Sequence, residues 1–153
     1  MLKLNMDEIV PLIKEVIYSG ATFRLFPHGT SMQPTIKEGK DSVELSAPST
    51  INVLDAVLYQ RENGQYVLHR IVKKHGEYLD MCGDNQIDIE KNVETHRVIA
   101  KVTGIYRGDK YISSQDKSFK KEIRKLYRKK SLRRIYHRII KIIRPIYRSI
   151  FKK

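Results

Sequence analysis

Residues 53–73, VLDAVLYQRENGQYVLHRIVK, consist of two apolar runs separated by a short polar stretch. That stretch contains Asn63-Gly64, and both residue types tolerate the positive φ angles that a tight hairpin turn requires. The flanking runs are rich in Val, Leu, Ile and Tyr, which favour strands. The segment therefore predicts two antiparallel strands joined by a tight turn.

The same texture of short apolar runs and turn residues extends over residues 21–116. Gly76 and the pair Gly108-Asp109 mark two more tight turns. Strands are expected at residues 22–26, 42–46, 53–60, 65–73, 77–82, 95–107 and 110–113. Short strands with turns between them predict a mainly β protein, built as a compact antiparallel domain over residues 21–116.

Helical periodicity flanks this β domain. Residues 1–20 contain apolar side chains at helical spacing from Met6 onward, with Asn5 and Glu8 as a capping-box pair and Gly20 at the end. Residues 117–153 also have apolar side chains at helical spacing. We expect an N-terminal helix and a C-terminal amphipathic helical tail.

Two residues are expected to interrupt the C-terminal tail. Ser131 is predicted to divide it into two helices by capping the second. Pro145 is predicted to kink its end.

Charge is divided unevenly along the 153 residues, whose formal net charge is +13. Residues 1–116 contain 14 Lys and Arg against 16 Asp and Glu, whereas residues 117–153 contain 16 Lys and Arg against the single acid Glu122. The body is thus nearly neutral and the tail is strongly basic. This distribution excludes a uniformly basic nucleic-acid coat protein.

Several other classes are excluded by composition. The apolar stretches are far shorter than the roughly 20 residues that span a bilayer, and the N-terminus does not resemble a signal peptide. Cys82 is the single cysteine, and the five histidines are not paired at metal-ligand spacing. We expect no disulfide, no metal and no cofactor, and a cytoplasmic location.

Residues 26–36, FPHGTSMQPTI, have an unusual composition for a loop. Small residues surround Ser31, so the backbone can turn sharply and present the hydroxyl beside free amide groups that could stabilise an oxyanion. A serine also needs a base within reach to become a nucleophile. The plain alternative is that Ser31 only caps a turn.

Two further segments supply groups that could act with this serine. The apolar run at residues 66–72 is interrupted by His69 and Arg70, which point to opposite faces of a strand. Without other evidence, the favoured interpretation of His69 is a buried core histidine. Gly83-Asp84-Asn85 follows the next run as a turn, and an acid there could orient a histidine.

In this order and spacing, the segments resemble the signal-peptidase and SOS-repressor (LexA-type) superfamily of serine peptidases. The resemblance covers roughly residues 22–107. The family pattern Gly-x-Ser-Met-x-Pro-Thr is matched by Gly29, Ser31, Met32, Pro34 and Thr35. The base-Arg box is matched by His69-Arg70, as in the signal peptidases that use Ser and His, and the Gly-Asp-Asn box by Gly83, Asp84 and Asn85.

The resemblance implies a role for each matched residue. Ser31 would be the nucleophile and His69 the general base, with the Ser31 amide as an oxyanion donor. Asp88 is the closer analogue of the third acid, with Asp84 and Glu90 as alternatives. The residues expected to shape the oxyanion site are Gly29, Thr30, Met32 and Pro34. Arg70, Gly83 and Asn85 are expected to be structural, with Arg70 paired to an acid of the third box.

The implied function is a serine endopeptidase that cleaves leader or exported peptides near a membrane surface. Signal peptidases are tethered by membrane spans, and the basic tail at residues 117–153 could substitute by lying on an anionic bilayer at the cytoplasmic membrane. Alternatively the tail packs on the β domain or on a partner helix, and nucleic acid is the least favoured partner. The competing function is a non-catalytic module of the same fold that binds peptide, membrane or nucleic acid.

Overall fold

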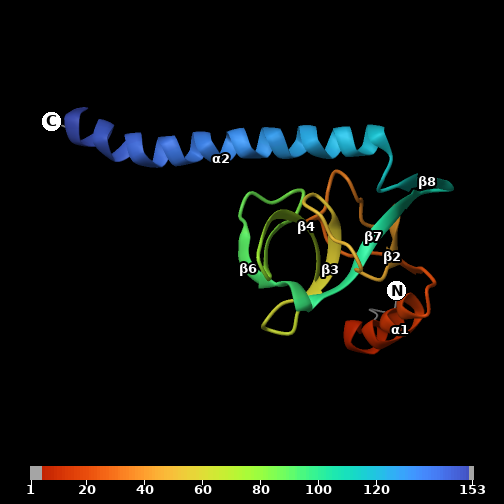
Figure 1. Ribbon diagram of the computed structural model, residues 1–153. Helices are drawn as coiled ribbons and strands as arrows, with labels where there is room; N and C mark the ends of the chain where they lie inside the picture. The colour runs from red at the N-terminus through yellow and green to blue at the C-terminus, as the bar shows by residue number, and fades with distance from the viewer. Residues whose placement is uncertain (1–4, 152–153) are drawn as a thin grey trace.

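The computed structural model describes the backbone of residues 5–151, and the side chains in this range except those of residues 137, 142 and 144–151. An antiparallel sheet forms the body, with one helix at each end of the chain (Figure 1). The elements are α1 (Met6–Tyr18), β1 (Phe23–Leu25), β2 (Asp41–Ser46), β3 (Ala56–Gln60), β4 (Tyr66–His75), β5 (Tyr78–Cys82), β6 (Glu90–Glu94), the 3₁₀ turn η1 (Thr95–Arg97), β7 (Val98–Arg107), β8 (Lys110–Ser113) and α2 (Lys117–Phe151).

The strands pair in the order β1-β2-β7-β3-β4-β5-β6, with β8 added to β7, and every pair is antiparallel. The predicted hairpin is confirmed, because β3 pairs with β4 around Asn63-Gly64. The strand expected at residues 95–107 begins only at Val98, since a 3₁₀ turn precedes it. β6 was not predicted because Val93 is its one apolar and one buried residue.

Two apolar clusters hold this sheet together, one on each face. Strands β3 to β6 curl around the smaller cluster, as the ring in Figure 1 shows, with Tyr59 and Ile71 fully buried inside it. The larger cluster lies on the other face, where α1 contributes Val10, Ile13 and Ile17. Because side chains alternate along β4, His69 and Arg70 point to different faces.

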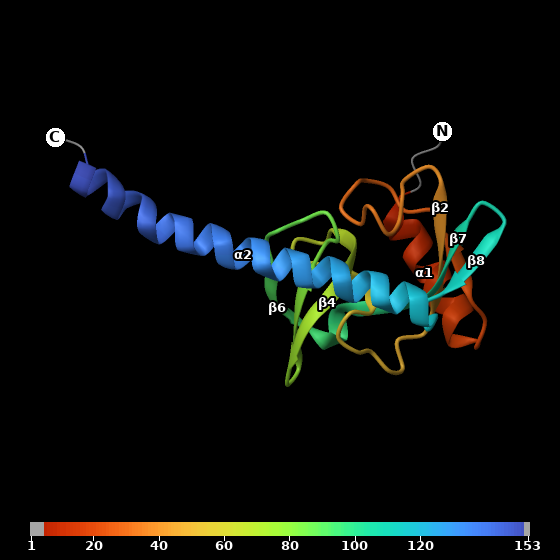
Figure 2. The ribbon, with the colours of Figure 1, turned by 90° about the horizontal axis from the view of Figure 1, so that it is seen from above.

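The C-terminal helix differs from the expected tail in two ways. It is continuous from Lys117 to Phe151, so the predicted break at Ser131 is wrong, and the helix also runs on through Pro145. Its first part is not a separate tail, because Phe119, Ile123 and Tyr127 are buried in the larger cluster. Only the later part of α2 extends past the β domain, as Figures 1 and 2 both show.

None of the helices in the described part of the chain is long and apolar enough to cross a membrane.

Candidate active site

Ser31 lies in the loop between β1 and β2, which is anchored to the core from within. Met32 and Ile36 are 4% and 2% exposed and belong to the larger cluster. Gly29 has φ +93°, a conformation that glycine adopts without a steric penalty. The amide of Gln33 donates to the carbonyl of Thr30 at 3.1 Å, which closes a turn around Ser31. The sequence therefore places a half-buried serine on a tight, well-anchored turn.

The Gly83-Asp84-Asn85 turn holds this loop by its backbone. The amide of Asn85 donates to the carbonyl of Ser31 at 2.8 Å. A Cβ atom on Gly83 would lie 2.7 Å from that same carbonyl oxygen, so only glycine fits there. Two segments far apart in the sequence thus pack backbone against backbone at Ser31.

Asp84 is at the centre of a buried polar cluster and forms no hydrogen bond with His69 in the described part of the chain. Its two carboxylate oxygens accept hydrogen bonds from Arg70 Nε at 2.9 Å and Nη2 at 2.7 Å. The hydroxyl of Tyr127 donates to it at 2.8 Å, and Thr35 Oγ1 also donates to it. Burial opposes ionisation, but Arg70 and these donors hold the pKa of Asp84 below its usual range. The expected structural pairing of Arg70 is present, and a catalytic role for Asp84 is not supported by its contacts.

His69 lies in β4, 2% exposed, opposite Val57 of β3. Its Nδ1 atom is 3.4 Å from the hydroxyl oxygen of Tyr59. That hydroxyl donates to Glu90 Oε2 at 2.7 Å, and Arg61 donates to the same oxygen from Nε at 2.9 Å. His69 is therefore connected to a carboxylate through Tyr59, and the acid is Glu90.

Burial and the nearby cation of Arg61 lower the pKa of His69 to about 4, against the opposing attraction of Glu90. The imidazole is consequently neutral at pH 7. Only the neutral form can accept a proton, so His69 has the protonation state that a general base requires.

Ser31 and His69 line one cleft of about 240 Å³, together with Gly29, Arg61 and Gln86. Among the described residues, Ser31 Oγ forms no hydrogen bond, so the serine and the imidazole share a cleft without being bonded. Contacts of this kind are often loose before substrate binds.

Asp88, the favoured third acid, is exposed and lines a neighbouring hollow with His69 and Glu90. Its backbone carbonyl accepts a hydrogen bond from Cys82 Sγ at 3.3 Å, and its side chain makes no hydrogen bond to His69 within residues 5–151. Of the three acids considered, Glu90 has the connection to the imidazole. Thr30 and Pro34 lie in the Ser31 loop, as the motif requires.

Two groups of functional contacts were not predicted from the sequence. Tyr59 and Arg61 both donate hydrogen bonds to Glu90. Val57 lies opposite His69, and Tyr59 is on the same face of β3 as Val57, so the β3–β4 register places Tyr59 near His69. The second group comes from α2 and reaches the Gly-Asp-Asn segment. Lys130 Nζ donates to the Gly83 carbonyl at 2.6 Å, and Arg134 Nε donates to the Ile87 carbonyl at 2.8 Å.

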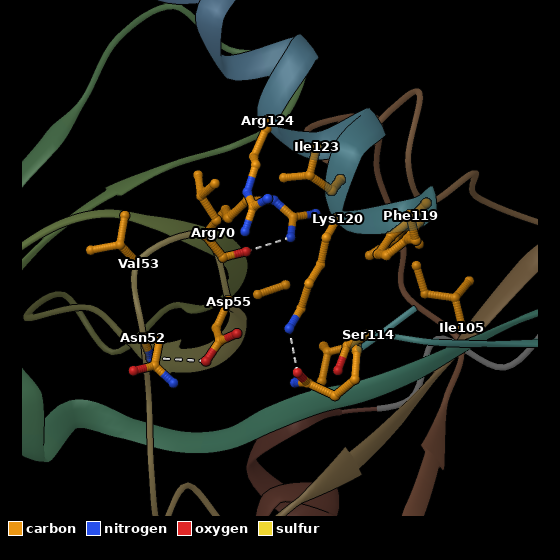
Figure 3. A pocket seen from close by; sticks show the side chains of 15 residues that line it. Asn52, Val53, Asp55, Arg70, Ile105, Ser114, Phe119, Lys120, Ile123 and Arg124 are labelled. Atoms are coloured by element: carbon orange, nitrogen blue, oxygen red, sulfur yellow. Dashed lines mark hydrogen bonds between the residues drawn. The ribbon is translucent and has the colours of Figure 1, made fainter. Parts of the chain in front are cut away.

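A separate cavity of about 280 Å³ lies beneath the start of α2 (Figure 3). Two of its charged side chains are already engaged: Arg70 Nη1 donates to the Leu54 carbonyl at 2.7 Å, and Asp55 pairs with Lys101 at 2.8 Å. Lys120 Nζ donates a hydrogen bond to Gln115 Oε1. Neither Ser31 nor His69 lines this cavity. Among the side chains that the structure describes, no three His, Cys, Asp or Glu are grouped to hold a metal ion.

Comparison of the chain with protein-family models, with curated proteins and with solved structures found no match.

Proposed function

We propose that this protein is a serine endopeptidase of the signal-peptidase type, with Ser31 as the nucleophile and His69 as the general base. One observation carries the proposal: these two side chains, from the β1–β2 loop and from β4, line the same cleft while the imidazole is neutral. The motif residues around both are those that the superfamily pattern calls for.

The contacts of His69 determine which ring nitrogen would act as the base. Because the Tyr59 hydroxyl gives its proton to Glu90, its oxygen accepts from His69 Nδ1–H. That arrangement keeps the proton on Nδ1 and leaves Nε2 as the basic nitrogen, in the way that an acid orients the histidine of a triad. Nε2 takes the Ser31 proton as Oγ attacks the peptide carbonyl, and the resulting imidazolium is stabilised by Glu90 through Tyr59. The imidazolium then gives that proton to the amine, which leaves as the peptide C–N bond breaks, and a water molecule deprotonated by Nε2 hydrolyses the acyl-enzyme and releases Ser31.

The tetrahedral intermediate needs donors for its oxyanion. Gly29 supplies no side chain, so the donors are backbone amides of the loop, that of Ser31 among them. The loop is held in place by the Asn85 amide and by the absence of a side chain at Gly83. Leader or exported peptides are the proposed substrates.

The test is hydrolysis of a quenched-fluorescence peptide library by the full chain and four variants. Ser31→Ala and His69→Ala should each lower kcat/KM by about 10³ or more, and the double variant should lose little further, since the two act as a unit. Ser49→Ala and His96→Ala replace exposed residues of the same types and should leave the rate unchanged. Undiminished hydrolysis by Ser31→Ala would contradict the proposal.

A second candidate is a peptide-binding module without hydrolysis. It is favoured by one observation, the lack of a Ser31–His69 hydrogen bond in the described part of the chain. In that case the same library would yield bound peptides, measurable by fluorescence polarisation, from both the wild-type chain and Ser31→Ala, with no cleavage by either.

A further inference from the structure

Helix α2 carries two apolar stripes, and they face opposite ways. The first stripe consists of Phe119, Ile123 and Tyr127, all buried against the β domain. The second stripe consists of the residues Leu132, Ile135, Ile139 and Ile143, which are 67%, 54%, 48% and 54% exposed. Ile123 and Leu132 are nine positions apart, or about two and a half turns, in one unbroken helix. The second stripe therefore points away from the β domain.

The same outward side is basic along the first part of the helix. Lys121 and Lys125 precede Leu132 by about three and two turns, so they lie in line with it. Lys117, Arg128 and Lys129 lie near that line, and all five side chains are exposed. The outer face of α2 thus consists of a row of cations followed by a row of aliphatic side chains.

Beyond the domain, the other side of the helix is polar. Exposed Lys141 lies roughly opposite the aliphatic row, and exposed Arg138 lies about 100° around the helix from the middle of that row. In Figures 1 and 2 no other element of the protein covers this part of α2. An apolar side opposed to a cationic side is the pattern of a helix that lies in a membrane interface.

We propose that the outer face of α2 binds an anionic lipid bilayer, with the aliphatic row at the acyl boundary and the β domain held on the aqueous side. The charge and the apolar row of this segment favour an anionic bilayer over a second copy of the helix and over a nucleic acid. Residues 117–153 contain 16 basic residues and one acid, so a second copy of the helix would bring two strongly cationic segments together. A nucleic acid would match the cations but would leave the aliphatic row against water.

The experiment is co-sedimentation of the full chain with phosphatidylglycerol vesicles and, in parallel, with phosphatidylcholine vesicles. Binding is expected to the first, and much weaker binding to the second. Lys121→Gln with Lys125→Gln should weaken partitioning about 30-fold, because each cation at such a surface contributes about 1 kcal/mol. Leu132→Ser with Ile139→Ser should weaken it at least about tenfold.

The matched control is Arg138→Gln with Lys141→Gln, which removes an equal number of charges from positions off the outer face and should have a smaller effect than the Lys121 and Lys125 pair. All these positions are exposed, so the urea midpoint of each variant should equal that of the wild-type chain. Equal losses of vesicle binding in the two double-charge variants would contradict the proposal that the outer face of α2 is the one that contacts the bilayer. So would full binding by the aliphatic variant, a dimer in analytical ultracentrifugation that this variant abolishes, or tighter binding to RNA than to vesicles.

Discussion

Replacing Asp84 by Asn should destabilise the whole protein by about 3–5 kcal/mol, the usual cost of removing one partner from a buried ion pair. Asp84 accepts two hydrogen bonds from Arg70, at 2.9 and 2.7 Å, and one from Tyr127 at 2.8 Å. Asn keeps one oxygen and turns an NH₂ group toward the guanidinium, so buried Arg70 loses its counter-charge. With a urea dependence of about 2 kcal/mol per molar, the unfolding midpoint should fall by about 2 M.

The assay is urea unfolding followed by circular dichroism, with Asp88→Asn as the matched control. Asp88 is exposed, so its variant should stay within about 0.5 kcal/mol of the wild-type chain. A milder variant, Thr35→Val, removes one donor to Asp84 and should lower the free energy of unfolding by about 1–3 kcal/mol even if Asp84→Asn does not fold. An unchanged midpoint for Asp84→Asn, together with lost peptide hydrolysis, would refute the structural role and restore Asp84 as a catalytic acid.

Three further predictions follow from the same contacts. Since folding lowers the pKa of His69 from 6.5 to about 4, the unfolded chain takes up the proton first. Stability should fall by up to about 3 kcal/mol between about pH 6.5 and pH 4, as thermal melts can measure, and His69→Gln should remove most of that slope. Tyr59→Phe should lower kcat about tenfold with little change in KM, and should move the acidic limb of the pH–rate profile. A chain ending at residue 134 should keep its cooperative melt, whereas one ending at 116 should lose it, because it lacks three core side chains of α2.

Each of these has a clear opposite outcome. A melting temperature that does not change between about pH 6.5 and pH 4 would show that folding does not lower the pKa of His69. An unaltered profile for Tyr59→Phe would remove the relay to Glu90. A stable chain ending at residue 116 would show that the apolar contacts of α2 are dispensable.

Local chemistry made part of this protein predictable. Asn63-Gly64 between two apolar runs predicts the β3–β4 hairpin because turn geometry is set by neighbouring residues. The sharing of one cleft by Ser31 and His69 agrees with the spacing of the motif. The polar strand β6 had no such signal, since its backbone pairing with β5 holds it there and only Val93 packs inside.

The parts that the sequence did not predict depend on relative orientation. The helical period of residues 117–151 shows apolar side chains, but it does not say that Ile123 packs on the sheet while Leu132 faces outward. The charge of residues 117–153 marks the whole segment as basic but does not indicate which basic side chains are buried. Lys130 is buried and donates to the Gly83 carbonyl. Glu90 as the acid connected to His69 requires the register of β3 with β4, which a linear pattern does not specify.

The continuity of α2 makes the number of residues between its two stripes as important as their identity. Inserting two residues between Ile123 and Leu132 would rotate everything beyond by about 200°, turning the aliphatic row toward the side of the β domain. Inserting seven would complete about two turns and restore the original direction at a greater distance. Related chains with this arrangement should therefore vary at the exposed positions of this stretch, keep the buried Tyr127 and Lys130, and change its length only in steps close to whole turns. The length of the helix therefore sets the direction in which the aliphatic row faces relative to the β domain.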